Sequence, residues 1–510
     1  PLQEGLIYAG TDDGLIQVTE NGGDSWRRID VGSMPGVPPT AFVNDIKADL
    51  YDASTVYVAL DNHKYGDFSP YLMKSTDKGN SWTSMTGNIP DRTLVWRLVQ
   101  DHEEPNLMFA ATEFGIYFTA DGGNYWSELD GDVPTISFRD IAIQRRENDM
   151  VAASFGRGIF ILDDISPLRE LSSSMLSDEA TLFNTRKAWW YIPKPKLSFG
   201  PGKGSQGMSH YIAKNPPFGA VFTIYLSEDL KSLEDKRKQQ EKPLIEQKRD
   251  VPFPGWEAID EEMTTPDPKT WLIVSDGDGN VIRRIEGPSK KGFHRIAWDL
   301  RYPSPQGVDD DDSFEGGSGL LAPPGTYNVH IVKQENGEFT QLTETRSFEV
   351  EQLREGALEP APMSERNEFW RNYEDLISRT DAFDSRLEEV MEKTKAIMIA
   401  FGRASIPVGD MDNTAYQLRS DVIDLEKAYG GNRARLQIGQ KNPPTVGDRM
   451  FALYKGVSNS TYGPTETHKK TVDILTSELT ELENTLISIE TRVGQLLEQM
   501  KDAGLPPVTE

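Results

Sequence analysis

A pattern of eight residues occurs three times in the first third of this chain, and it limits the fold more than any other feature. The pattern [ST]-x-[DN]-x-G-x-x-W spans residues 19–26, 75–82 and 119–126. An Asp or Asn followed two residues later by Gly favours a tight hairpin turn, in which the side-chain oxygen accepts backbone N–H bonds. The Trp that ends the pattern is expected to begin the next strand and to pack between sheets. Repeats of this kind are typical of four-stranded β-propeller blades, which take roughly 40–50 residues each.

The predicted hairpin resembles the Asp-box (BNR) hairpin, which is the repeat of sialidases, xyloglucanases and sortilin-type propellers. In propellers of that type the boxes lie at the rim, so we expect them to be structural rather than catalytic. Their structural residues here are Asn21, Gly23, Trp26, Asp77, Gly79, Trp82, Asp121, Gly123 and Trp126. The alternative interpretation is a set of unrelated hairpins in a β-sandwich.

Short β-rich runs precede each box and indicate the strands of the blades. A further run, at residues 41–48, 94–100 and 136–143, precedes the others in every unit but the first, and it would form the innermost strand. A fourth unit has its runs but no box. The sequence therefore predicts about four blades over residues 1–165, the first of them incomplete. We interpret them as the C-terminal blades of a propeller whose other blades lie upstream, on the same or a cleaved chain.

The rest of the chain divides into three parts. Residues 166–205 are rich in Pro, Gly and Ser and are predicted to be a linker. Residues 206–352 show alternating strands of an immunoglobulin-like β-sandwich, interrupted by a charged insertion at 227–268. Residues 364–505 have apolar residues at helical spacing and predict an α-helical bundle with long antiparallel helices. The apolar seam in its last helix is either an internal core or a docking surface for a partner helix.

Composition excludes several classes of function. The net charge of −27 argues against a nucleic-acid partner and against docking on anionic lipid, because both need a basic face. There are no cysteines, which excludes disulfides, thiolate catalysis and cysteine-based metal sites. The sequence has no apolar run that approaches the length of a membrane span.

Several longer stretches indicate a family. Residues 154–171, 298–301, 322–327, 443–450 and 460–465 resemble segments of large bacterial sortilin-type propeller proteins. Proteins of this group are often labelled as glycosyl hydrolases or exo-alpha-sialidases on Asp-box similarity alone. The resemblance implies an exported bacterial protein that is periplasmic, associated with the outer membrane, or extracellular. It implies no known reaction.

Candidates for catalysis are few. A sialidase-like site needs an arginine cluster, a Tyr nucleophile and acidic partners, and its usual Arg-Ile-Pro-like motif does not occur in the sequence. A xyloglucanase-like site needs two opposed carboxylates. The candidates are Asp140 on a predicted inner strand and Asp12, Asp13 and Glu113 after strands. Most acidic loop residues of an acidic protein are only solvated, so none is a strong candidate, and an active site would lie mainly in the upstream blades.

Calcium is the one ion that the sequence leaves open. The six histidines form no zinc motif. Asp276 and Asp278 begin a calcium-like loop that lacks the final Glu, so a hairpin turn is the competing interpretation. Asp309 and Asp311 belong to an acidic run in a Gly/Ser loop, for which a solvated loop is the competing interpretation. No other cofactor is predicted.

Ligand binding is the function that the sequence favours. Trp96, Arg97, Arg139 and Asp140 lie on predicted inner strands, which face the axial channel of a propeller. Arg157 lies in a Phe-Gly-Arg-Gly turn, where it either binds a ligand carboxylate or braces Asp163 or Asp164 of its own blade. We therefore expect a non-catalytic exported protein that binds a peptide, a protein or a glycan, or that serves as a subunit of an envelope complex. A glycoside hydrolase and a purely structural scaffold are the alternatives.

Overall fold

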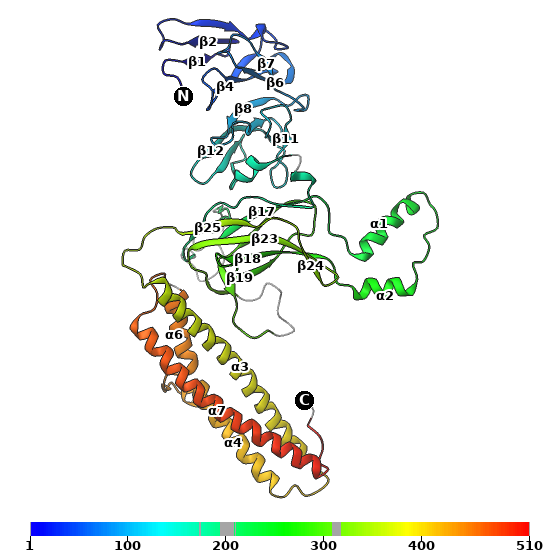
Figure 1. Cartoon of the computed structure of the whole chain (residues 1–510), viewed down its shortest axis with the longest axis vertical. Helices are drawn as coiled ribbons and strands as arrows, with labels where there is room; N and C mark the ends of the chain where they lie inside the picture. The colour runs from blue at the N-terminus through cyan, green and yellow to red at the C-terminus, as the bar shows by residue number, and fades with distance from the viewer. Residues whose placement is uncertain are drawn as a thin grey trace.

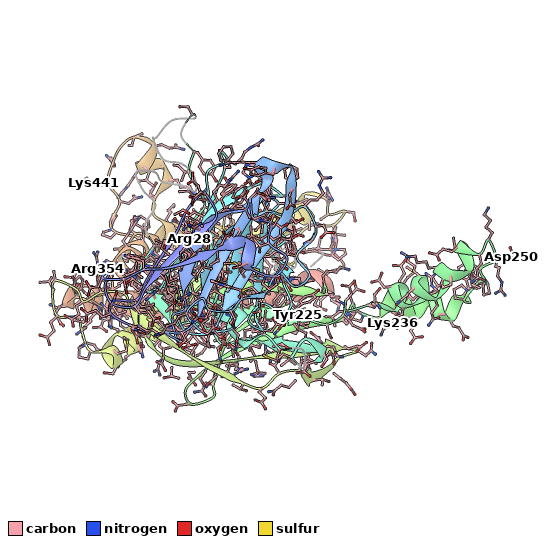
Figure 2. The ribbon with its side chains drawn as sticks, turned by 90° about the horizontal axis from the view of Figure 1, so that it is seen from above. Arg28, Tyr225, Lys236, Asp250, Arg354 and Lys441 are labelled. Carbon is pink, nitrogen blue, oxygen red and sulfur yellow. The ribbon has the colours of Figure 1, made fainter. Side chains whose placement is uncertain are left out.

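Sheets form the N-terminal and middle parts of the molecule, and long helices form its C-terminal part (Figure 1). The computed structural model describes residues 2–172, 175–193, 209, 211–308, 318–458 and 460–508. A helical arm projects from the middle part, and Figure 2 shows from above that it points away from the body.

The N-terminal part contains four antiparallel sheets, each built from strands that follow one another in the chain. The strands are β1 (Ile7–Gly10), β2 (Leu15–Thr19), β3 (Arg27–Asp30), β4 (Phe42–Ala48), β5 (Val56–Asn62), β6 (Asp67–Ser75), β7 (Thr83–Ser84), β8 (Val95–Gln100), β9 (Met108–Thr112), β10 (Ile116–Thr119), β11 (Ser127–Glu128), β12 (Phe138–Gln144), β13 (Asp149–Ser154) and β14 (Ile159–Leu162). The runs expected to be innermost strands form β4, β8 and β12, the first strands of their sheets. Up-and-down sheets in this succession are the arrangement of β-propeller blades.

Buried apolar side chains hold these sheets face to face. One cluster joins the β1–β3 sheet to the β4–β7 sheet, a second joins that sheet to the β8–β11 sheet, and a third continues to the β12–β14 sheet. Alternate side chains of β5 enter two different clusters, as the period of two along a strand requires, so β5 is buried on both faces and lies between two neighbouring sheets. After β14 the chain forms a 3-10 turn at Ser166–Glu170. Arg169 of this turn binds the buried carboxylate of Asp101 through its Nε and Nη2 atoms, at 2.7 and 2.9 Å.

The middle part combines two larger sheets and a short one. The sheet orders are β15-β17-β20, β16-β25-β23-β18-β19 with β24 beside β23, and β21-β22. The strands are β15 (Ala180–Leu182), β16 (Ala188–Trp190), β17 (Ala220–Leu226), β18 (Lys269–Asp276), β19 (Val281–Glu286), β20 (Gly292–Trp298), β21 (Arg301–Pro303), β22 (Ser318–Leu321), β23 (Gly325–Glu335), β24 (Glu338–Gln341) and β25 (Arg346–Gln352).

The segment expected as a linker at 166–205 is partly structured. It contributes β15, which pairs with β17, and β16, which runs parallel to β25. The reason is that these short runs carry large apolar side chains, and Trp190 is fully buried with its indole N–H bound to the carbonyl of Ala322 at 2.8 Å. Residues 194–205 lie outside the described residues.

The charged insertion at 227–268 forms the projecting arm. It contains α1 (Leu233–Glu246) and α2 (Trp256–Thr264), and the hydroxyl of Ser232 caps α1. Arg237 joins the two helices through Nε and Nη2 bonds to the carboxylate of Glu262, at 2.7 and 3.0 Å. A bidentate pair of this kind fixes the angle between two short helices that bury little apolar surface.

The C-terminal part is a helical bundle, but its two longest helices are parallel rather than antiparallel. Its helices are α3 (Met363–Gly402), α4 (Met411–Gly430), α5 (Arg433–Gln437), α6 (Val446–Ser458) and α7 (Glu466–Asp502). Arg379 binds Glu483 and Arg386 binds Glu490, and both pairs are separated by 104 residues. A constant separation requires α3 and α7 to run in the same direction. The chain returns along α4 to α6, so that α7 starts again beside the start of α3.

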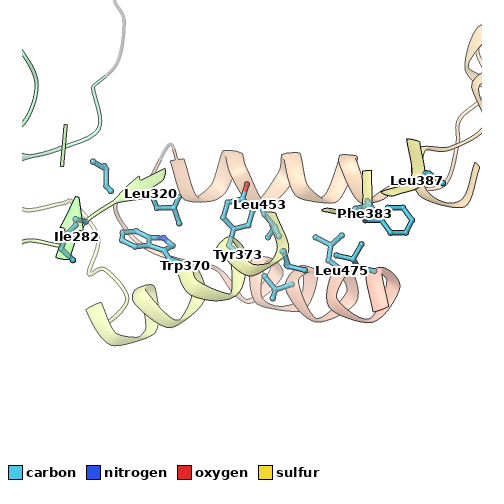
Figure 3. Close-up of a cluster of buried hydrophobic side chains, with 14 of the residues drawn as sticks. Ile282, Leu320, Trp370, Tyr373, Phe383, Leu387, Leu453 and Leu475 are labelled. Carbon is cyan, nitrogen blue, oxygen red and sulfur yellow. The ribbon is translucent and has the colours of Figure 1, made fainter. Parts of the chain in front are cut away.

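One apolar core continues from the middle sheets into the bundle. Figure 3 shows Ile282 and Leu320 of the sheets near Trp370 and Tyr373 of α3, followed by Phe383 and Leu475 further along the bundle. The predicted seam of α7 lies in this core: Val472, Leu475, Leu479, Leu486, Ile489, Val493, Leu496 and Met500 are buried. Leu482 is only half-buried. The seam therefore serves as an internal core.

Candidate functional site

A β-bulge occurs at the same place in three first strands of the N-terminal sheets. The pairing register shifts between Val43 and Asp45 in β4, between Val95 and Arg97 in β8, and between Phe138 and Asp140 in β12. The extra residues are Asn44, Trp96 and Arg139. A bulge leaves one residue unpaired and turns side chains out of the regular alternation. The three bulges therefore direct two successive side chains of each strand toward neighbouring sheets.

The residues after the bulges form a ladder of charges. Arg97 lies between two carboxylates, with its Nη1 atom 3.1 Å from Asp45 and its Nε atom 2.8 Å from Asp140. Asp45 is buried and also accepts the backbone N–H of Leu98. Burial lowers the pKa of Arg97, but the charges of Asp45 and Asp140 outweigh it and raise the pKa overall. The ladder thus ties together the sheets that begin with β4, β8 and β12.

The bulge residues themselves form a second layer. The guanidinium of Arg139 stacks on the ring of Trp96 at 3.7 Å and also faces Phe155 at 5.0 Å. The indole N–H of Trp96 donates to Glu113 at 3.0 Å, and the hydroxyl of Ser137 donates to the same oxygen. Arg139 lies 3.6 Å from that oxygen as well. Stacking on an indole holds an arginine in place while its charge stays available to a ligand.

The structure adds His63, which the sequence did not single out. Its ring lies 5.9 Å from the ring of Trp96 in an edge-to-face arrangement. Its Nδ1 atom is bound to the buried carboxylate of Asp61. The signal in the sequence was its place after β5, in the same type of loop that carries Glu113 after β9. We call Asp45, His63, Trp96, Arg97, Glu113, Arg139 and Asp140 the bulge cluster.

Exposed aromatic side chains lie at the same end of the sheets as the bulge cluster. Three lie in the hairpins between the second and third strands and one lies at the start of β6, and these hairpins are at the end of the bulges because neighbouring strands are antiparallel. These residues are Tyr65, Phe68, Phe114 and Phe155, and the side chain of Phe155 is 72% exposed. Aromatic side chains supply much of the binding energy where proteins meet, so their exposure near two arginines indicates a recognition surface.

The ligand-binding candidates are not all brought together. Trp96, Arg97, Arg139 and Asp140 belong to the bulge cluster. Arg157 is exposed in the turn between β13 and β14, and it forms no ion pair with any residue that the structure describes. The expected brace to Asp163 or Asp164 is therefore not formed. Instead Arg295 of β20 donates to the backbone carbonyls of both residues and so joins the middle sheets to the β12–β14 sheet.

The catalytic candidates are held by neighbouring groups or are isolated. Glu113 accepts bonds from Trp96 and Ser137, and Asp140 binds Arg97 and the backbone N–H of Ile141 at 2.9 Å. Asp12 is exposed in the β1–β2 hairpin, and the neighbouring Asp13 accepts a bond from the hydroxyl of Thr11. A glycosidase needs one carboxyl group that stays protonated and an opposed one that stays ionised. Here Glu113 and Asp140 are instead bound by donors of the protein itself, Glu113 by Trp96 and Asp140 by Arg97.

The three boxes form nearly identical turns. In each one the Ser or Thr hydroxyl accepts the N–H of the box Gly, and the Asp or Asn oxygen accepts the N–H of the residue before the Trp. Hydrogen bonds from Ser81 and Ser75 lower the pKa of Asp77 to about 2. Trp82 and Trp126 are buried between sheets, with 8% and 1% of their surface exposed. Trp26, which was expected to pack in the same way, is 47% exposed.

The structure describes only some of the calcium candidates. Asp276 ends β18, and one of its oxygens accepts the N–H groups of Asp278 and Asn280 in the hairpin that leads to β19. A side-chain bond from Asn280 contributes most to lowering the pKa of Asp276. Asp309 and Asp311 lie outside the described residues. Within the described ranges, no three His, Cys, Asp or Glu residues are grouped so that they could hold a metal ion. Nor does any helix in those ranges have the length and apolar character of a membrane span.

Comparison with known proteins gives structural likenesses but no family. No family model and no curated protein matches the sequence. The solved structures that match include YCF48 bound to D1 peptide, at 16% identity over 30% of this chain and 47% of that chain, with a TM-score of 0.23. An ancestral GH74 enzyme matches at 15% identity over 66% of this chain and 37% of that chain, with a TM-score of 0.26.

A third likeness is to PorZ, a bacterial surface component of the type-IX secretion system of Porphyromonas gingivalis. It matches at 10% identity over 68% of this chain and 36% of that chain, with a TM-score of 0.26. This chain thus spans between about a third and a half of the length of these three structures. Likenesses this distant carry no argument about activity, so function has to be argued from the bulge cluster and its surroundings.

Proposed function

We propose that this protein is a non-catalytic β-propeller protein that binds a peptide or a segment of another protein at the bulge cluster. The observation that carries the proposal is the combination of Trp96 and Arg139, stacked at 3.7 Å, with exposed aromatic residues on the adjoining hairpins. Arginine and aromatic side chains are the types enriched where binding energy is concentrated. A peptide also offers the carboxylates and apolar side chains that such a surface recognises.

Hydrolysis of a glycoside is the weaker alternative. The carboxylates of Asp45 and Asp140 share Arg97, and that of Glu113 is bound by Trp96 and Ser137. Groups committed to these bonds support an arrangement of side chains rather than proton transfer. A purely structural role is also weaker, because 40% of the Arg139 side chain and 72% of Phe155 are exposed to solvent.

The wider setting of the binding surface belongs to the same proposal. The sheets up to β14 are the blades of an Asp-box propeller, and further blades lie upstream on the same or a cleaved chain. The middle sheets form an immunoglobulin-like sandwich, which with the helical bundle supports the propeller in an envelope complex. The protein is exported by a bacterium and works in the periplasm, at the outer membrane or outside the cell. The box turns and the face-to-face packing of the sheets support the propeller in this proposal.

Binding to an array of short unstructured peptides tests the proposal. Peptides that the unmodified protein binds are measured again with Phe155→Ala and Arg139→Ala, which remove exposed groups at the bulge cluster. We expect each substitution to weaken binding about tenfold or more, which corresponds to about 1.4 kcal/mol. Tyr416→Ala is the matched control, because Tyr416 is an equally exposed aromatic residue on α4. Equal binding by all three variants would contradict the proposal, and xyloglucan hydrolysis that Asp140→Asn abolishes would favour the enzyme.

A further inference from the structure

The contact between a box and the preceding sheet is seen most fully at Trp126. Its indole N–H donates to the carbonyl of Met85 at 2.9 Å, in the segment that follows β7 of the preceding sheet. Asn88 of that segment accepts the backbone N–H of Trp126 and donates to its carbonyl. A side chain at Gly123 would come within 2.6 Å of the end of Met85. The box of one sheet thus fits closely onto the outer segment of the sheet before it.

Trp82 repeats the packing of this contact one sheet earlier, but its buried indole N–H has no hydrogen-bond partner among the residues that the structure describes. It packs in the cluster that contains Ile29 and Val31, which belong to β3 and the turn after it. A side chain at Gly79 would come within 2.9 Å of the end of Ile29. Arg27 of β3 adds bonds to the carbonyls of Lys78 and Gly79, at 2.5 and 3.2 Å. Two successive boxes therefore use the same surface to bind the preceding sheet.

The first box presents this surface to solvent. Its turn is fully formed, since the N–H of Gly23 binds Thr19 at 2.9 Å and the N–H of Ser25 binds Asn21 at 3.0 Å. Trp26 is nevertheless 47% exposed. A side chain at Gly23 would meet only the ring of Trp26 itself, at 3.9 Å or more. Ile7, on the outer face of the same sheet, is 47% exposed as well.

We infer that the surface formed by Ile7, Gly23 and Trp26 binds the outer edge of another antiparallel sheet of the same repeat type. The partner sheet would place an aliphatic or Met side chain against Gly23, as Ile29 and Met85 do at the later boxes. One of its backbone carbonyls would accept the indole N–H of Trp26, as the carbonyl of Met85 accepts that of Trp126. This inference rests on the propeller architecture in the proposed function and specifies the partner surface by its chemistry. The occupant is a repeat sheet and not a second copy of this chain.

A chain with one duplicated unit tests the inference. Gly5 and Asn106 hold equivalent positions, because their carbonyls accept the N–H groups of Gly22 and Gly122. A second copy of residues 42–106 placed directly before Leu6 would therefore supply a sheet and a first strand in register. Hydroxyl-radical oxidation read by peptide mass spectrometry then measures the exposure of each tryptophan. We expect Trp26 to be oxidised severalfold faster than Trp126 in the unmodified chain, and at the rate of Trp126 in the extended chain.

A variant of the copy provides the control. Met85→Asp in the added copy alone should restore rapid oxidation of Trp26. If Trp26 stayed reactive although circular dichroism showed the added strand content, the copied sheet would be folded without covering Trp26, and the inference would be wrong. Peptide binding at the bulge cluster is measured separately with Phe155→Ala, so failure of the proposed function would not be confused with failure of this contact.

Measurements on the unmodified chain keep the inference testable even if the extended chain does not fold. Trp26→Ala should leave the melting temperature unchanged, whereas Trp126→Ala should lower it, because only Trp126 is already packed. An equal loss from both substitutions would show that Trp26 is already covered and would overturn the inference. Sedimentation is the last check. A dimer of the unmodified chain that Trp26→Ala dissociates would assign the surface to a second copy and would also overturn it.

Discussion

Arg97 illustrates how one side chain can serve both stability and recognition. It reaches Asp45 on β4 and Asp140 on β12, so it joins three sheets at the level of their bulges. Asp45 is buried, while more than half of the Asp140 side chain is exposed. The contact of Arg97 with Asp45 is therefore in a low-dielectric environment. Its contact with Asp140 is in water, where a charge pair contributes little to stability. The ladder also fixes the bulge residues Trp96 and Arg139 beside it.

Removal of the Arg97 charge should destabilise the N-terminal sheets. In Arg97→Met the buried carboxylate of Asp45 keeps the N–H of Leu98 but loses the closer of the two counter-charges that the structure describes for it and retains Lys47, at 3.6 Å. We expect a loss of about 2 kcal/mol in the free energy of unfolding, less than for a fully buried pair, because Lys47 remains and Arg97 is partly exposed. Urea unfolding measures it. Arg28→Met is the matched control, because Arg28 is exposed on β3, and an equal loss in both variants would contradict this role of the ladder.

A second residue-scale prediction concerns acid stability at Asp101. Burial raises the pKa of Asp101, but bonds from Arg169 and from the N–H groups of Glu103 and Glu104 outweigh it and lower the pKa overall. A carboxyl whose pKa is lower in the folded state stabilises the fold above its unfolded pKa of about 3.9. That stability is lost as the pH falls through the folded value.

We therefore expect Asp101→Asn to be less stable than the unmodified protein at pH 7. We also expect this difference to shrink as the pH falls below about 4, where the unmodified protein loses the contribution of Asp101. Melting temperatures between neutral pH and acid measure the difference. Arg169→Met should behave in the same way, because it removes the partner instead of the carboxyl. A constant difference across the whole range would show that Asp101 is not the group that titrates.

At the scale of elements, the sequence predicted which segments form strands and helices better than it predicted the relative direction of the helices. The apolar runs that predicted innermost strands match β4, β8 and β12 to within two residues, because short runs of β-branched and apolar residues bounded by turn residues leave a clear signal. The sequence also predicted the buried seam of α7, because its apolar residues recur at regular helical spacing. It did not predict the direction of α7 relative to α3, because a helix buries the same stripe against a parallel and an antiparallel neighbour. The direction of α7 depends on the path of the chain from α4 to α6, and the short segments that connect these helices determine that path.

The candidate site was predictable only in part. Trp96, Arg97, Arg139 and Asp140 could be found because they lie on innermost strands. The bulges at Val95/Arg97 and Phe138/Asp140 could not, because an extra unpaired residue leaves no mark in the hydrophobic pattern. His63 was missed because it lies in a loop, where no periodicity applies. The exposure of Trp26 depends on whether another sheet packs against its box. The sequence of the box alone therefore could not predict it.

The seam of α7 leads to a prediction for the bundle. Leu479 is fully buried among the helices, whereas Ile487 on the same helix is 49% exposed. Leu479→Ala should lower the free energy of unfolding by about 3 kcal/mol, through lost apolar contact and the cavity it leaves. Ile487→Ala should change it by less than about 0.5 kcal/mol, as exposed substitutions do. Chemical denaturation followed by helix circular dichroism measures both, and equal effects would contradict the internal seam.

At the scale of the whole molecule, contacts of different kinds join the three parts. Arg295 attaches the middle sheets to the β12–β14 sheet through hydrogen bonds to the backbone carbonyls of Asp163 and Asp164. The middle sheets and the bundle instead share one apolar core (Figure 3). Arg366 of α3 strengthens that joint, because it lies over the ring of Trp190 and donates to the carbonyl of Thr461. Salt and changes of pH weaken polar contacts between parts of a molecule. A shared apolar core instead makes two parts unfold together.

The shared core predicts how the molecule melts. Trp370 lies where α3 leaves the middle sheets, beside Leu320 and Ile282 in Figure 3, and only 8% of it is exposed. In the unmodified protein the middle sheets and the bundle should unfold in one calorimetric transition, because neither can lose the joint without exposing core side chains of the other.

Trp370→Ala removes a large side chain of the joint, so we expect the transition to split and the helical signal to be lost at a lower temperature than the sheet signal. Tyr416→Ala, an exposed residue of α4, should leave a single transition. Two transitions already present in the unmodified protein would show that the apolar joint does not couple the sheets to the bundle.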